Sequence, residues 1–369
     1  MDRLRTLLEI NHGSLRQIRS MEGMRGLAVF LVFLVHYTTL VSPWLTAGGT
    51  VAATATRLHA MGNVGVDLFF VLSGYLIYGT LIEKPRSLVR YFRRRVERIY
   101  PTFLVVFVVY LVLSLLLPRQ SKIPTDSLLG AAEYLVANLL LLPGLLPIEP
   151  MITVAWSLSY EMFYYLVVPL ILGGLGLRRW PRRWRVLAFG LASLAGLGYA
   201  LAYGGVHIRL VMFVSGILLF EAMDSEALPR IDLLGLLALL VGLAVIDRLA
   251  GGPLRYAVLF GAFFLLCHAT FYGNARAHRL FCWTPLRWLG NMSYSFYLIH
   301  GLVLKAAFLV LARASAPAGD WGPVAFWTWL PVMFLLTLPP AGVLFALVEK
   351  PFSLPAKAAP ARLDAVKAS

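Results

Sequence analysis

Apolar residues along this chain gather in long, almost uninterrupted runs, whereas a water-soluble domain alternates apolar and polar positions. A helix needs about 20 such residues to cross the hydrocarbon core of a bilayer. Windows of this kind occur near residues 24–42, 64–82, 99–117, 156–176, 186–203, 207–223, 231–247, 256–272, 291–312 and 325–347. The pattern therefore predicts an all-α, polytopic transmembrane bundle of about ten spans.

Residues 128–142 form an eleventh apolar run, which is shorter and contains Glu133 and Asn138. We expect a helix on the lipid surface or a re-entrant helix, with an eleventh span as the alternative. An eleventh span would move the arginine-rich segment 178–185 to the outer side of the membrane. The distribution of positive charge argues against that arrangement.

Basic residues set the expected orientation. Seven Lys and Arg lie in residues 84–98 and five in 178–185, and ten spans put both segments on the same side as the termini. Positive loops mark the cytoplasmic side, so both termini are expected in the cytoplasm. The expected divisions are a cytoplasmic N-terminal segment 1–20, a membrane domain 21–350 and a disordered cytoplasmic tail 351–369.

Composition supports a membrane protein and narrows its partners. Hydrophobic residues make up 59% of the 369, charged residues 14%, and the mean hydropathy is +0.76. The pI of about 10.1 does not indicate nucleic-acid binding, because the basic residues cluster between apolar runs as topology requires. The seven histidines show no metal-ligand spacing, so no metal site is expected.

Ionisable residues inside the apolar runs are the first candidates for function. Arg25 and His36 are eleven residues apart, which places them on one helix face with a rise of about 16 Å between them. His36 is predicted to act as a general base, and helix packing is the alternative. Asp67 and Glu161 are expected at the same outer level, where either carboxylate would orient the imidazole.

A cluster of arginines precedes the third apolar run. Arg93, Arg94, Arg95 and Arg98 exceed what orientation alone requires, which suggests a polyanion such as lipid headgroups or a nucleotide with several phosphates. Arg95 and Arg98 stand at i and i+3, so one phosphate can meet both. Arg25 is expected to line the same path or to anchor in the lipid headgroups.

Other polar residues within the runs are candidates for lining a pore, with helix packing or an aromatic belt at the interface as the alternative. These are Ser73, Tyr160, Tyr294, Ser295 and His300.

Five motifs in this order resemble the integral-membrane acyltransferase family 3, over about residues 20 to 350. They are Arg25 with His36; Phe69-Phe70-x-x-Ser73-Gly74; Arg95-x-x-Arg98; Trp156-Ser157-Leu158 with Glu161; and Ser293-Tyr294-Ser295 with Tyr297 and His300. One departure is Met162, where many members carry a second acidic residue.

The resemblance implies transfer of an acyl group, usually acetyl, from a cytoplasmic acyl-CoA to a hydroxyl. The usual acceptor is a surface carbohydrate or its lipid-linked precursor, and some members acylate small molecules such as macrolides. Acyl-CoA is then a substrate, and no resident cofactor is expected. Direct transfer and a covalent acyl-His36 intermediate stay open. A transporter of a glycan precursor is the competing hypothesis, since polar residues at mid-depth fit a conduit too.

Overall fold

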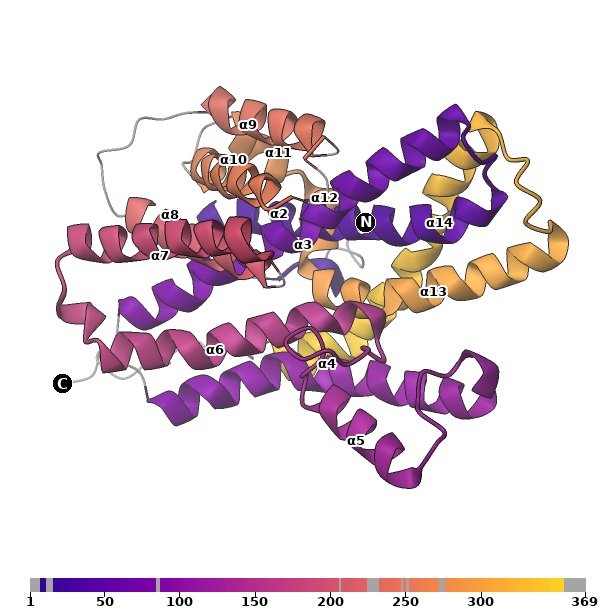
Figure 1. Cartoon of the computed structure of the whole chain (residues 1–369), viewed down its shortest axis with the longest axis horizontal. Coiled ribbons are helices and arrows are strands. Elements are labelled where there is room, and N and C mark those ends of the chain that lie inside the picture. Colours follow the sequence, from indigo (N-terminus) through magenta and orange to yellow (C-terminus); the bar gives the residue numbers. More distant parts are fainter. Residues whose placement is uncertain are drawn as a thin grey trace, which may run out of the picture.

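The computed structural model describes residues 7–10, 16–83, 87–205, 207–223, 232–246, 248–249, 252–271 and 276–354. These residues form a helical bundle without strands (Figure 1). Its helices are α2 (Arg16–Val41), α3 (Thr50–Ile82), α4 (Leu88–Leu116), α5 (Leu128–Leu139), α6 (Trp156–Gly174), α7 (Arg182–Tyr203), α8 (Val211–Met223), α9 (Asp232–Val245), α10 (Leu254–Phe271), α11 (Arg276–Phe281), α12 (Thr284–Asn291), α13 (Ser293–Ala314) and α14 (Pro323–Leu344), followed by the π-helix η6 (Phe345–Ser353).

Eight helices of the described chain are long and apolar enough to cross a membrane, namely α2, α3, α4, α6, α7, α10, α13 and α14 with its extension η6. The chain is therefore a multi-pass membrane protein with the predicted all-α architecture. The other two predicted windows contain α8 and α9, for which the structure describes 13 and 14 helical residues, and both helices border residues outside the described chain.

Two long helices begin earlier than their apolar windows. α4 starts at Leu88, so the arginine cluster lies on helix and not in a cytoplasmic loop. Arginine has high helix propensity, and the stretch between Ser87 and Pro101 contains no glycine or proline to interrupt it. α3 likewise starts at Thr50, fourteen residues before its window. Apolar content therefore predicts where a chain crosses the membrane, but it does not predict where the helix begins or ends.

Glycines let three helices approach closely. A Cβ on Gly65 of α3 would lie 2.4 Å from the carbonyl oxygen of Ala28 on α2. A Cβ on Gly74 would lie 2.0 Å from the carbonyl oxygen of Phe213 on α8. These contacts fix α3 between α2 and α8.

Contacts at the helix ends place the N-terminal residues beside the last helix. Lys350 Nζ donates to the carbonyl oxygen of Leu7 at 2.8 Å, and at the opposite end of α2 the backbone of Trp321 bonds to that of Trp44. An even number of membrane crossings places both ends of the chain on the same side, which agrees with these contacts. Residues 1–6, 11–15 and 355–369 of the expected N-terminal segment and tail lie outside the described residues, and η6 continues to Ser353. The cytoplasmic assignment and the domain limits stay predictions.

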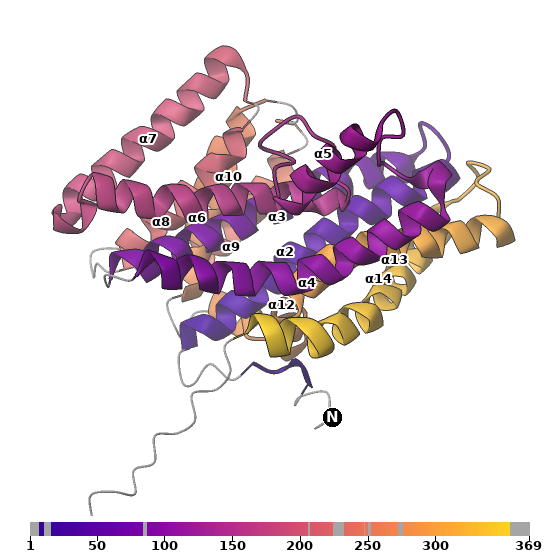
Figure 2. The same ribbon diagram turned by 90° about the horizontal axis from the view of Figure 1, so that it is seen from below.

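The segment after α4 folds back along that helix. α5 has twelve residues, too few to cross, and Figure 2 shows it to one side of α4, separated from the middle of that helix. The hydroxyl of Tyr100 donates to the carbonyl oxygen of Leu139 at 3.2 Å, although Tyr100 precedes the end of α4 by about 24 Å. This return agrees with a re-entrant arrangement.

Replacing Gly74 with alanine tests the close approach of α3 and α8. The added methyl meets backbone, which cannot move aside as a flexible side chain does, so Gly74→Ala is expected to destabilise the protein by ~1–3 kcal/mol. Gly190→Ala on α7 is the matched control, because nothing lies within 4 Å of its Cβ position. Thermal unfolding in detergent compares the two. Equal stability of both variants contradicts this packing.

Candidate functional site

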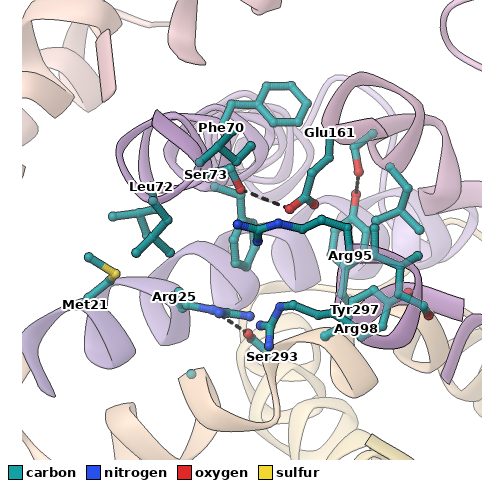
Figure 3. Close-up of a pocket in the computed structure, with 18 of the residues that line it drawn as sticks. Met21, Arg25, Phe70, Leu72, Ser73, Arg95, Arg98, Glu161, Ser293 and Tyr297 are labelled. Carbon is teal, nitrogen blue, oxygen red and sulfur yellow. Dashed lines mark hydrogen bonds between the residues drawn. The ribbon is translucent and has the colours of Figure 1, made fainter. Parts of the chain in front are cut away.

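A cavity of about 380 Å³ lies between α2, α3, α4, α6, α12 and α13, within the size range of ligand sites (Figure 3). Its apolar wall includes Phe69, Phe70, Leu72 and Leu158. Its polar wall includes Arg25, Ser73, Arg95, Arg98, Glu161, Tyr165, Ser293, Tyr294 and Tyr297. We call this cavity the arginine pocket. It gathers residues from all five motifs.

Three guanidinium groups define the arginine pocket. Arg25 of α2 and Arg95 and Arg98 of α4 point into one space, seen together in Figure 3. Arg25 Nε donates to Ser293 Oγ at 3.2 Å, and Arg95 stacks on the Tyr91 and Tyr165 rings at 5.1 and 4.8 Å. Among the described residues, no carboxylate lies within ion-pair distance of any of the three. Such a cluster is prepared for an anion.

Glu161 is the acidic group inside this cluster. Its carboxylate accepts hydrogen bonds from Ser73 Oγ, at 3.4 Å, and from the hydroxyl of Tyr165 one turn further along α6. Both neighbours are neutral donors, so Glu161 does not neutralise an arginine through a direct ion pair. The excess charge of the pocket stays positive.

A second cluster of charged residues includes Glu22, which lines the arginine pocket together with Ile10. Arg287 of α12 binds Glu9 and Glu22, each at 2.8 Å, and Trp288 Nε1 donates to Glu9 at 3.0 Å. Burial opposes the charge of Arg287, but its hydrogen bonds and charge interactions with the two carboxylates outweigh burial and raise its pKa. The pairing ties the N-terminal segment to α2 and α12.

His36 lies away from the arginine pocket and both predicted carboxylates. Because Gly65 faces Ala28 and Gly62 faces Leu31, Asp67 is level with about residue 26, roughly 15 Å along the bundle from His36. Glu161 lines the pocket at the level of Arg25. The structure therefore does not bring the three groups to one depth. The close neighbour of His36 is His300, with ring centroids 4.9 Å apart.

Asp67 has a different partner. Its carboxylate lies 3.8 Å from Arg209 Nε, and their side chains are 2% and 14% exposed. Arg209 also donates to Asn63 and lies over the Trp156 ring at 5.3 Å. This ion pair joins α3 to the segment before α8, so it explains the buried carboxylate without a role in orienting His36.

The remaining candidates divide between the pocket and its surroundings. Ser73 and Tyr294 line the pocket, whereas Tyr160 bonds to His207 at 2.8 Å and Ser295 donates to Glu349 at 2.6 Å. Arg93 and Arg94 of the predicted anion-binding set are exposed and do not line the pocket, and Arg93 pairs with Glu97 at 3.1 Å. The part of the chain that the structure describes contains no group of three side chains able to hold a metal ion.

Comparison with known families agrees with this geometry. The profile of the Acyltransferase domain, acyltransferase family 3, matches residues 18–346. This chain belongs to acyltransferase family 3. The match includes Arg25, His36, both pocket arginines of α4 and Glu161, so the resemblance found in the sequence is confirmed.

Curated relatives are similar over most of the chain. The chain is 26% identical to the O-acetyltransferase OatA of Staphylococcus aureus over 325 residues, covering 77% of this chain and 50% of that protein. It is 25% identical to the acyltransferase MdmB of Streptomyces mycarofaciens, covering 91% of each. It is 30% identical to the putative membrane-bound transacylase BcsY of Komagataeibacter xylinus, covering 81% and 76%. The chain thus spans about half the length of OatA. No solved structure matches it.

Several residues of this family 3 site were not predicted. Tyr165 stands four residues after Glu161 and so shares its helix face, a signal the sequence contains. Glu349 accepts from the backbone and side chain of Ser295, and it lies two residues beyond the last apolar window, so it was not among the ionisable residues found inside the runs. The pairing of Arg287 with Glu9 and Glu22 joins distant segments and leaves no local signal.

The Asp67–Arg209 pair predicts a loss of stability on changing either partner. Asp67→Asn leaves the Arg209 charge buried without its counter-ion, which costs ~3 kcal/mol. The double variant with Arg209→Met is expected to recover part of that loss, as thermal unfolding of the detergent-solubilised proteins will show. Glu97→Gln, which breaks the exposed pair with Arg93, is the control. An inactive Asp67→Asn protein of normal stability contradicts a structural role.

Proposed function

We propose that this chain is a membrane O-acyltransferase that binds acyl-CoA in the arginine pocket and transfers its acyl group to a hydroxyl. The observation that carries the proposal is the convergence of Arg25, Arg95 and Arg98, which have no carboxylate within ion-pair distance in the described part of the chain. The diphosphate and ribose phosphate of coenzyme A supply the charge that these guanidinium groups lack. Arg93 and Arg94 add positive potential at the start of the same helix and attract the donor.

The thioester reaches His36 by extension of the pantetheine arm. Arg25 and His36 are separated by about 16 Å along α2, which is close to the length of that arm. Tyr297 connects the two regions, since it lines the pocket and its ring centroid lies 6.3 Å from that of His300. In this proposal the phosphates of the donor bind at the arginines, and its thioester carbonyl carbon lies near His36.

The transfer needs one proton to move. His36 takes the proton of the acceptor hydroxyl as its oxygen attacks the thioester carbonyl, and the carbon–sulfur bond breaks to release the coenzyme A thiolate. The imidazolium then returns the proton to sulfur. Acetyl is the proposed acyl group and oxygen the proposed acceptor atom, because OatA is named an O-acetyltransferase.

The proposed acceptor is a surface carbohydrate or its lipid-linked precursor, and the proposed location is the inner membrane of a bacterial cell. The bacterial relatives and the apolar helices support that location. A small-molecule acceptor is the alternative within the same chemistry. A glycan transporter is disfavoured because transport of a glycan does not require a cluster of three arginines that has no carboxylate partner among the described residues.

Coenzyme A binding tests the pocket assignment. Arg98→Gln removes a charged donor worth ~1.5–3 kcal/mol, so the dissociation constant for coenzyme A is expected to rise about ten- to a hundredfold. Calorimetry on the protein in lipid nanodiscs measures it. Arg183→Gln on α7, an exposed arginine outside the pocket, is expected to bind as wild type does. Equal affinity of the two variants contradicts the assignment.

Loss of the imidazole tests the base. His36→Ala is expected to reduce acyl transfer by about 10²–10⁴-fold while coenzyme A binding persists, because His36 lies outside the arginine pocket. Mass spectrometry of surface glycan and lipid-linked sugars from cells with the gene deleted, restored or mutated measures the acetyl groups. Full acetylation by His36→Ala refutes the base. Loss of the glycan itself, rather than of its acetyl groups, indicates a transporter.

A further inference from the structure

His300 of α13 is the ring that faces His36. Its side chain is fully buried, and the two imidazoles meet edge to face, with centroids 4.9 Å apart and planes inclined by 73°. One face of the His300 ring stacks on Phe296 at 5.2 Å, which fixes the plane of the imidazole. Two imidazoles joined by an N–H···N bond of about 3 Å have ring centroids about 5 Å apart, so the separation of the two rings is compatible with a direct hydrogen bond.

The contacts of His300 define its tautomer. Nδ1 lies 2.9 Å from the carbonyl oxygen of Phe296 and 2.9 Å from that of Tyr297. Carbonyl oxygens only accept hydrogen bonds, so Nδ1 carries the proton. In the neutral ring Nε2 is then an unprotonated acceptor. Nε2 is buried, and it has no partner among the described residues.

An unsatisfied acceptor in an apolar bundle is costly, and a native structure retains one where it serves a purpose. The carboxylates first expected beside His36 are engaged elsewhere, Asp67 with Arg209 and Glu161 with Ser73 and Tyr165. Within the described chain, His300 Nε2 is the buried acceptor next to the proposed base.

We propose that His300 is a positioning residue for His36. Its Nε2 accepts a hydrogen bond from one ring N–H of His36, so the other ring nitrogen of His36 is held as the lone pair that receives the hydroxyl proton. When His36 becomes an imidazolium, the same bond stabilises the charge. A neutral imidazole suits this depth better than a carboxylate, because the resting pair buries no net charge.

α13 also couples this pair to the donor. Tyr297 lines the arginine pocket through its side chain and accepts from His300 Nδ1 through its carbonyl oxygen. Its hydroxyl is fixed by Ser157 at 2.7 Å and by the carbonyl oxygen of Val154 at 3.0 Å. One turn of helix therefore holds both the wall against which the donor lies and the ring that orients the base.

The role of this pair in acyl transfer rests on the proposed function, but the hydrogen bond itself does not. The test is nitrogen NMR of the protein with ¹⁵N-labelled histidine in nanodiscs. The chain has seven histidines, and His36→Gln and His300→Gln spectra assign the two signals. The expected result is a single tautomer of His36 with scalar coupling across an N–H···N bond to His300. Absence of that coupling in the wild type overturns the proposal.

Two variants separate positioning from packing. His300→Phe keeps an aromatic ring against Phe296 but removes the acceptor, so His36 is expected to populate both tautomers. His300→Gln retains an acceptor and is expected to preserve a single tautomer. Unchanged His36 signals in a His300→Phe protein that still binds coenzyme A overturn the proposal. The wild-type coupling decides the matter if that variant does not fold.

Thiol release from acetyl-CoA, with membrane lipid extract as the acceptor source, gives the kinetic readout. His300→Phe is expected to lower kcat at least about tenfold without changing KM for acetyl-CoA, and His300→Gln to recover part of that loss. An increase in KM with kcat unchanged contradicts positioning. No release by the wild type, with the coupling present, refutes the proposed transfer and leaves the His36–His300 bond established.

Discussion

The arrangement of this protein depends on three guanidinium groups that lie half-buried in an apolar helix bundle, with no carboxylate within ion-pair distance among the described residues. Charge removed from water without a counter-ion is unfavourable, so Arg25, Arg95 and Arg98 need compensation from hydroxyls and aromatic faces. Ser293 bonds to Arg25, while Tyr91 and Tyr165 cover the faces of Arg95. These contacts hold the guanidinium groups in place but do not neutralise them. The uncompensated positive charge is the reason for proposing that an anionic donor binds there.

In the proposed function, the donor binds at one position along the bundle and reacts at another. α6, α7 and α8 lie toward one end of the molecule and α13 and α14 toward the other (Figure 1). α2 and α3 connect the groups through glycines that bring their backbones together. Arg25 and His36 are held on one helix, α2, and Arg95 and Arg98 reach the pocket from α4. In the proposed function, a flexible linker in the donor matches the spacing between the arginines and His36.

Hydrophobic runs predicted the class of fold because the bilayer requires long apolar helices with every backbone group satisfied. The same rule explains where the structure differs from the prediction. α3 and α4 extend as helix beyond their apolar windows, because hydropathy reports burial in lipid and not the ends of a helix. Arg95 and Arg98 were predicted to act together because three residues separate neighbours on one helix face.

Residue depth was the weakest inference from the sequence. Counting residues from span ends placed Asp67 and Glu161 beside His36, but tight glycine contacts between α2 and α3 put Asp67 about ten residues of α2 away from His36, and Glu161 lines the pocket with Arg25. The partner that the structure supplies, His300, comes from a helix more than 250 residues away in sequence. Such pairings are set by packing between distant segments and have no local signature in one chain.

The central claim is that coenzyme A places its phosphates among Arg25, Arg95 and Arg98. The most direct measurement is a cryo-electron microscopy map of the wild-type protein in a nanodisc with coenzyme A. The account predicts phosphate density within hydrogen-bond distance of these three guanidinium groups and pantetheine density running toward Tyr297. Coenzyme A absent from the pocket, or a lipid headgroup in its place at saturating coenzyme A, contradicts the account.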